Sequence, residues 1–103
     1  MNEHYLKIWP EHFNNVKNGN KTFEIRKNDR AFQKGDFVRL KEFDPKVKKD
    51  IEGFAIDGEY TGRSLDFKIG DVYPIDAERV VFSLCHYHSR TLRLEEMNEK
   101  IYC

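Results

Sequence analysis

The chain has 103 residues, a length that fits one domain spanning residues 1–103 and leaves no room for two. Charged residues make up 35% of the chain, and the 14% aromatic content exceeds what disordered chains carry. No apolar run approaches the roughly 18 residues that a membrane-spanning helix needs, and the first residues lack a signal-peptide pattern. We therefore expect a small globular cytoplasmic domain with no membrane partner.

The formal net charge is zero, but the charges are unevenly distributed. Residues 1–50 contain 12 basic and 8 acidic side chains, a net charge of +4, whereas residues 51–103 contain 6 and 10, a net charge of −4. Because phosphates respond to the local field rather than to the total, the zero sum does not exclude a polyanionic partner. A solvated surface of interspersed charges is the alternative interpretation.

Three segments in the first half alternate between apolar and polar residues, the period of a half-buried strand: residues 4–9, 22–27 and 37–43. Their apolar faces are formed by Leu6 with Ile8, Phe23 with Ile25, and Val38 with Leu40. Pro10 ends the first strand and suits a first helical turn, and the sequence Asn18-Gly19-Asn20 stops a helix. The pattern predicts a short helix over residues 10–18, capped by Gly19 in the left-handed conformation.

The second half is less regular. Residues 46–59 are rich in lysine and interrupted by glycine, which predicts a long loop, and residues 60–63 predict a turn. Residues 64–69 alternate again, and residues 80–85 form the most strongly β segment, which we expect to be a central strand. The tail, residues 89–103, fits a strand followed by a short helix. Five or six short strands with one early helix predict a small β-barrel of α+β character.

The densest chemical signal lies directly after the predicted helix. Lys21 follows the turn. Glu24 and Arg26 are two residues apart in the next strand, so their side chains point to the same face. We expect Phe23 and Ile25 to be buried behind them, so that a lysine, a carboxylate and a guanidinium converge. A surface ion-pair cluster worth about 0–1 kcal/mol is the alternative interpretation.

This segment resembles a known signature. The run Gly19-x-Lys21-Thr22-x-Glu24-x-Arg26 resembles the G-x-K-x-x-E-x-R motif of the ASCH domains, which are relatives of the PUA RNA-binding domains. The closer similarity is to an uncharacterised bacterial and phage family of ASCH-like domains, the domain of unknown function DUF3850. It covers roughly residues 4–84 and includes residues 4–10, 19–30, 35–36, 42–45, 60–63 and 80–84.

The resemblance implies a PUA-like fold, a small, partly closed barrel of five to six strands with one or two short helices. It also implies a cleft between the barrel and the early helix, lined by the motif residues, in which ASCH domains are thought to bind RNA or a modified nucleobase. The partner that we expect is therefore RNA or a modified nucleoside or nucleotide. The residues expected to bind it are Lys7, Trp9, Lys21, Glu24, Arg26 and Lys27.

The residue types suit this ligand. Lys21 and Arg26 fit phosphates or base edges, and Glu24 fits the exocyclic amine of a base such as cytosine. The rings of Trp9 and Tyr5 offer surfaces on which a base can stack, although Trp9 fits a core position equally well.

Two other functions remain open. One branch of ASCH-like proteins is similar in length and motif position and hydrolyses N4-acetylcytidine with a Lys-Thr-Glu trio. Lys21 stands where that lysine does, but Glu24 stands at the threonine's position, and the later glutamate has only loose candidates in Asp66, Asp71 and Glu78. If the chain is an amidohydrolase, Lys21 and Glu24 are the catalytic candidates, with Glu24 as the base toward water. A protein-interaction module that uses the acidic second half is the third hypothesis.

Two histidines near the end of the chain are candidate zinc ligands. His86 and His88 share a face of the last predicted strand, but a third and a fourth zinc ligand are not evident. We therefore expect no metal site and no cofactor.

Overall fold

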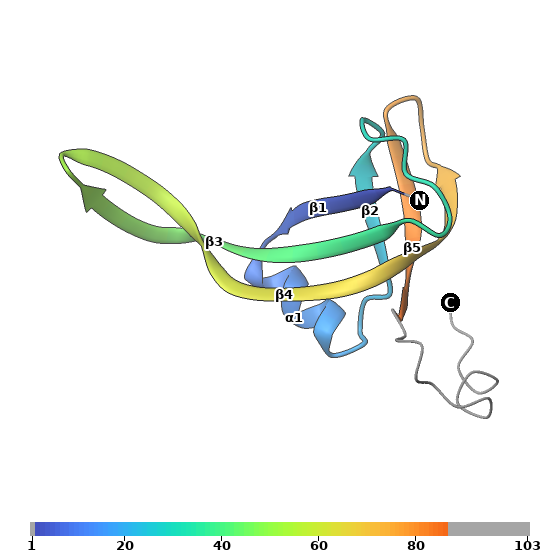
Figure 1. Cartoon of the computed structure of the whole chain (residues 1–103), viewed down its shortest axis with the longest axis horizontal. Helices are drawn as coiled ribbons and strands as arrows, with labels where there is room; N and C mark the ends of the chain where they lie inside the picture. Colours follow the sequence, from blue (N-terminus) through green and yellow to red (C-terminus); the bar gives the residue numbers. More distant parts are fainter. Residues whose placement is uncertain (1, 87–103) are drawn as a thin grey trace.

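The computed structural model describes residues 2–86, which form one sheet and one helix (Figure 1). The elements follow in the order β1 (Glu3–Ile8), α1 (Pro10–Lys17), β2 (Phe23–Lys27), β3 (Phe37–Ile51), β4 (Phe54–Pro74) and β5 (Arg79–His86). All five strand segments and the helix that the sequence predicts are confirmed. Gly19 has a φ of 80°, the left-handed conformation expected of the helix cap. The predicted elements of the tail, residues 89–103, lie outside the described residues.

The five strands form one sheet in the order β1-β3-β4-β5-β2. Strand β1 pairs with β3 in parallel, and the other neighbours pair antiparallel. Figure 1 shows the sheet strongly curved, with β2 and β5 crossing the direction of β1, β3 and β4. The edge strands β1 and β2 do not pair with each other, so this β-rich fold with one short helix is an open sheet and not a closed barrel. Strand β5 is an interior strand, while β4 holds the central position.

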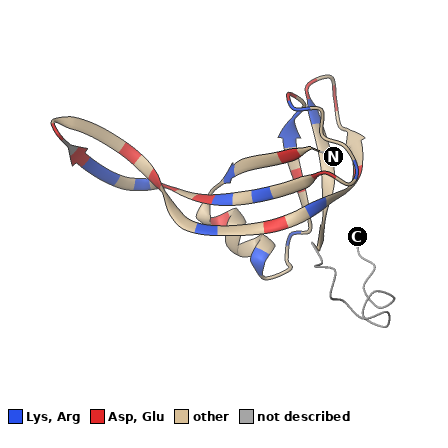
Figure 2. Cartoon of the chain, in the orientation of Figure 1, with Lys and Arg blue, Asp and Glu red and all other residues tan. Residues whose placement is uncertain are grey.

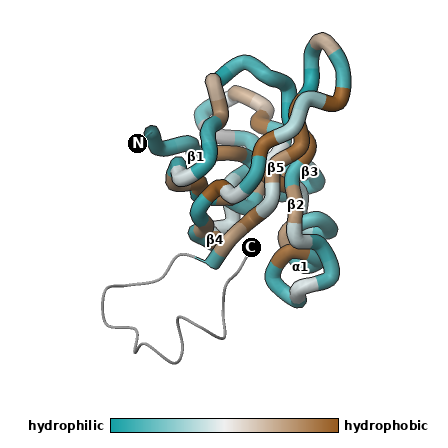
Figure 3. Tube along the Cα trace, turned by 90° about the vertical axis from the view of Figure 1, so that its right-hand side faces the viewer, coloured by the Kyte–Doolittle hydropathy of each residue, from teal (hydrophilic) through white to brown (hydrophobic). Residues whose placement is uncertain are grey.

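The core lies inside the curve of the sheet and is covered by α1. Val38 and Leu40 of β3 are fully buried, as their alternation predicts, and Phe13 and Val16 of α1 pack into the same core. Hydrophobic residues recur along β5 in Figure 3, where Phe82 is buried. The complete set of buried apolar residues is Leu6, Ile8, Phe13, Val16, Phe32, Val38, Leu40, Ile69, Val80, Phe82 and Leu84.

The loop predicted at residues 46–59 and the turn predicted at residues 60–63 are wrong. Both segments belong to a long hairpin of β3 and β4, which extends beyond the core as an arm (Figure 1). Glu52 and Gly53 have φ values of 52° and 82°, as a type I′ turn requires at both central positions. The arm lacks the apolar alternation of a strand that packs on a core, and cross-strand ion pairs Lys48–Asp57 and Lys49–Glu59 connect its strands instead.

The loop between β2 and β3 closes one end of the core. Phe32 is buried there, with its ring 4.6 Å from that of His4 and 4.9 Å from that of Phe82. The buried Asp36 carboxylate is 2.8 Å from Nε2 of His4 and accepts hydrogen bonds from the backbone N–H groups of Asn2 and Gln33. Burial raises the pKa of Asp36, but these hydrogen bonds lower it by more, so its net shift is downward. The pair ties the start of β1 to the loop.

Candidate functional site

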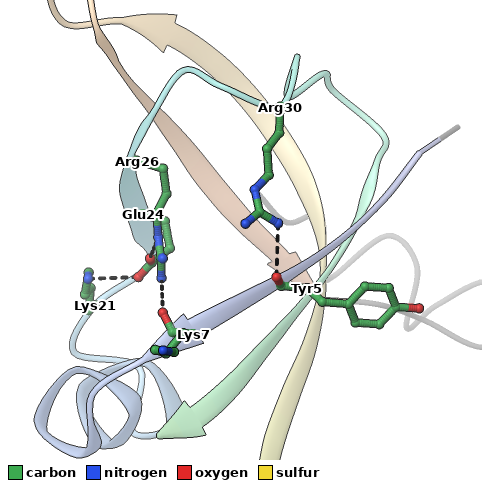
Figure 4. Close-up of polar contacts among 6 residues, drawn as sticks. All are labelled: Tyr5, Lys7, Lys21, Glu24, Arg26 and Arg30. Atoms are coloured by element: carbon green, nitrogen blue, oxygen red, sulfur yellow. Dashed lines mark hydrogen bonds and ion pairs between the residues drawn. The ribbon is translucent and has the colours of Figure 1, made fainter. Parts of the chain in front are cut away.

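Lys21, Glu24 and Arg26, which we call the Glu24 cluster, converge as the sequence predicts. The Nζ of Lys21 lies 2.9 Å from Oε1 of Glu24, and the Nε of Arg26 lies 2.8 Å from Oε2. Glu24 is only 2% exposed, so its carboxylate sits at the bottom of the group with one cation on each oxygen. Figure 4 shows the two cations on either side of the carboxylate.

The orientation of β2 is the reverse of the expected one. Glu24 pairs with the buried Phe82 of β5, and directly paired residues of antiparallel strands share a face, so Glu24 faces the interior. Phe23 and Ile25 are 43% and 45% exposed, and the expectation that they are buried behind the cluster is wrong. Lys21 is positioned by the end of α1, because its backbone N–H donates to the carbonyl of Asn15.

Two arginines, Arg26 in β2 and Arg30 in the loop that follows it, bridge the gap to β1. The Nη2 of Arg26 donates to the carbonyl of Lys7 in β1 at 2.9 Å, and Nη1 of Arg30 donates to the carbonyl of Tyr5 at 3.2 Å (Figure 4). These side chains take the place of backbone hydrogen bonds along this gap. The Glu24 cluster therefore lies where the curved sheet is open.

A cleft of about 430 Å³ opens over the cluster. It is lined by Lys7, Ile8, Trp9, His12, Lys21, Glu24, Ile25 and Arg26. Of the six residues expected to bind a ligand, only Lys27 is not among those that line it. Trp9 is 46% exposed, so it is not a core residue, whereas the Tyr5 ring points away from the cluster (Figure 4) and lies 6.4 Å from the Phe37 ring.

Sequence reasoning missed His12 as a residue of the cleft. Trp9 occupies the N-cap position of α1 without a side-chain capping hydrogen bond, and His12 follows three residues later; both line the cleft. The spacing of three residues between Trp9 and His12 is the only signal in the sequence that could have placed His12 beside Trp9. None of the loose candidates for a second catalytic carboxylate lines the cleft, and Asp66 forms a bidentate ion pair with Arg39 instead.

The cleft is cationic and keeps unused hydrogen-bonding capacity. Lys7, Lys21 and Arg26 contribute three positive charges and Glu24 one negative charge, a net charge of +2 with His12 neutral. The carboxylate has about four lone-pair sites, of which the cluster uses two, and lysine and arginine carry three and five N–H donors. The cleft can therefore donate to phosphate or carbonyl oxygens while Glu24 still accepts from an amine.

A further buried carboxylate, which sequence reasoning missed, lies in β3. Glu42 is 3% exposed and accepts hydrogen bonds from Nε and Nη2 of Arg63 at 2.9 and 2.7 Å and from the Thr61 hydroxyl at 2.6 Å. Hydrogen bonding to Arg63 lowers the pKa of Glu42 to about 2. Arg63 also donates to Oδ1 of Asn14 and lies over the Phe13 ring. We call Glu42, Thr61 and Arg63 the Glu42 cluster, and these contacts connect α1 to β3 and β4.

The residues of both clusters lie within a match to a known family. The sequence matches the family described as Domain of unknown function (DUF3850) over residues 3–84. The chain belongs to the DUF3850 family. The match confirms the resemblance to DUF3850 seen in the sequence, and the matched residues include the motif of the Glu24 cluster as well as Glu42 and Arg63. No curated protein matches the sequence.

Two features are absent from residues 2–86. No helix among these residues is long and apolar enough to cross a membrane. Nor does this part of the chain contain three or more His, Cys, Asp or Glu side chains grouped so that they could hold a metal ion. His88, one of the two histidines considered as zinc ligands, lies outside the described residues.

Proposed function

We propose that this DUF3850 domain has an ASCH/PUA-like fold and binds RNA or a modified nucleoside in the cleft over the Glu24 cluster. The curved sheet, bridged at its open edge by Arg26 and Arg30, supports a partly closed barrel of that type. A cleft of about 430 Å³ is within the size range of small-molecule sites and can take one nucleoside. Its polar floor and aromatic rim suit a base held by its edge.

The observation that carries the proposal is the burial of Glu24. A carboxylate that is 2% exposed loses its hydration, and replacing such ion pairs with apolar residues is often neutral or stabilising. Phe23 and Ile25 flank Glu24 in the sequence and face solvent, so β2 presents its charged side to the interior. Local sequence rules are broken in this way mainly at functional sites.

The residues are assigned roles from their chemistry. Glu24 accepts a hydrogen bond from an exocyclic amine, Lys21 and Arg26 donate to base carbonyls or phosphate oxygens, and Trp9 stacks on the base. Binding is favoured over hydrolysis because both carboxylate oxygens already accept hydrogen bonds from cations, which weakens Glu24 as a base toward water. The hydroxyl of the hydrolytic trio has no counterpart at this position.

The proposal is tested by calorimetric titration of a panel that contains cytidine, N4-acetylcytidine, uridine and short single-stranded RNAs. We expect Glu24→Gln to weaken binding of amine-bearing bases by about tenfold or more, because one hydrogen-bond acceptor is replaced by a donor. Glu78→Gln, at an exposed carboxylate outside the cleft, is the matched control and should bind normally. Turnover of N4-acetylcytidine by the wild-type protein, abolished in Lys21→Ala, would establish hydrolysis in place of binding.

A further inference from the structure

Aromatic and lysine side chains alternate on the outer surface beside the cleft. We call the group the aromatic–lysine platform, and it consists of Lys7, Trp9, Lys41, Phe43 and Tyr60. The Phe43 ring lies 5.8 Å from that of Trp9 and 5.1 Å from that of Tyr60. The Nζ of Lys7 lies 4.1 Å from the centre of the Phe43 ring, and the Nζ of Lys41 lies 4.6 Å from that of Tyr60.

Strand pairing places these side chains on one face. Lys7 and Lys41 are register partners in β1 and β3, and Phe43 is the register partner of Tyr60 in β4. Gly58 allows the Phe43 ring to lie against β4, since a Cβ at that position would lie 2.5 Å from the ring. The Trp9 and Tyr60 rings remain accessible, because they are 46% and 49% exposed, while Phe43 is half-buried between them.

Within residues 2–86, no carboxylate neutralises the charge of the platform. Lys7 and Lys41 form no ion pair with a carboxylate within residues 2–86, and both ammonium groups lie over rings instead. Farther along the same hairpin, Lys48 pairs with Asp57 and Lys49 pairs with Glu59. Figure 2 shows both signs of charge along the arm. Rings that alternate with unpaired cations suit bases that alternate with phosphates.

The platform and the cleft are continuous. Lys7 and Trp9 belong to both, since they line the cleft and also contact Phe43. A base held over Glu24 would leave its flanking nucleotides near Trp9, from which the platform extends toward Tyr60. A free nucleoside would leave this surface unused.

We propose that the ligand of the cleft is one base within a single-stranded RNA, whose flanking nucleotides stack on the aromatic–lysine platform. This inference rests on the proposed function of the cleft. The flanking bases stack on Tyr60 and Phe43, and the ammonium groups of Lys7 and Lys41 turn from the rings to the phosphates while their carbon stems remain packed.

The test compares a labelled five-nucleotide RNA, four uridines with a central cytidine, with cytidine alone. Tyr60→Ala should weaken RNA binding by about five- to a hundredfold, the range measured for one stacked base, and leave cytidine binding within about twofold. Lys41→Gln should reduce the slope of log affinity against log salt by about 0.7, the value for one phosphate contact on a single strand. The control is Tyr73→Ala, which removes another exposed tyrosine of the same strand, outside the platform, and should not change binding.

The outcomes separate the two proposals. If Tyr60→Ala and Lys41→Gln bind the RNA with wild-type affinity while Glu24→Gln does not bind it, the platform is refuted as an RNA-binding surface. The cleft then remains supported as the base site. If the platform variants lose RNA while Glu24→Gln binds both probes normally, the cleft is refuted as the base site. Equal wild-type affinity for cytidine and for the RNA would overturn the polymer ligand. Binding of neither probe would overturn the polymer ligand. If N4-acetylcytidine also fails to bind, the cleft is overturned as a base site and a protein partner is favoured.

Discussion

The Glu42 cluster should make a large contribution to stability, and Arg63→Met is the substitution that measures it. Methionine keeps the stem packed near Phe13 but leaves the Glu42 carboxylate, 3% exposed, with only the Thr61 hydroxyl. Hydrogen bonding to Arg63 and Thr61 lowers the pKa of Glu42 from 4.5 to about 2, which corresponds to about 3 kcal/mol at 1.36 kcal/mol per pKa unit. Because the Arg63 side chain is 45% exposed, water screens the pair, and we expect a loss of about 2–3 kcal/mol.

The assay is urea unfolding followed by circular dichroism. A matched control is Arg39→Met, because Arg39 holds Asp66 with the same bidentate geometry on an exposed surface and should contribute at most about 1 kcal/mol. A carboxyl whose pKa is lower in the folded than in the unfolded protein stabilises the fold above its unfolded pKa. The contribution of Glu42 to wild-type stability should therefore be complete above about pH 4.5 and be lost as the pH falls toward 2, and the advantage over Arg63→Met should shrink over that range.

Two results would refute this reasoning. One is an equal loss of stability in Arg63→Met and Arg39→Met at pH 7, which would mean that the burial of Glu42 does not strengthen the pair. The other is a difference between wild type and Arg63→Met that stays constant from pH 7 to pH 2.5. In that case packing, and not the charge of Glu42, would explain the loss.

Three further predictions concern the core, the hairpin and the ligand. Leu40→Ala should lower the free energy of unfolding by about 2–5 kcal/mol, whereas Phe54→Ala, at an exposed ring of the arm, should change it by less than about 0.5 kcal/mol in the same urea assay. Gly58→Ala should destabilise the protein by about 1–3 kcal/mol and weaken RNA binding, because its new Cβ displaces the Phe43 ring and its φ of 86° is strained; unchanged binding by a folded variant would show that Phe43 has no role. Wild-type affinity for single-stranded RNA should fall with salt at a log–log slope of about −0.7 per phosphate contacted, and a flat profile would indicate a neutral nucleoside or a protein partner.

Local pattern was enough to predict the elements of the fold. The period-2 alternation around Leu6, Val38 and Phe82 reports which residues can share one side of a strand, and that side is buried in all three. Pro10 and Gly19 mark the ends of α1 through their own backbone preferences. The arm was missed because it has no apolar face to reveal a strand, and because its Glu52-Gly53 turn lacks the Asn-Gly or Asp-Gly pair that signals a hairpin most strongly.

The candidate site was predictable only in part. Local alternation determines which of its residues share a face, but strand pairing and sheet curvature determine which face is interior and which distant residues meet. Alternation alone places Glu24 and Arg26 on the same face of β2, since both lie on one chain at a spacing of two. The pairing of β2 with β5 decides which face of β2 is interior. In this pairing Glu24 lies opposite Phe82, which is 58 residues farther along the chain. Hydrophobicity favoured the opposite orientation, with Phe23 inside. The contact of Arg26 with the Lys7 carbonyl, and the meeting of Glu42 with Arg63, require the curvature and register of the whole sheet, and these are tertiary properties that no local pattern encodes.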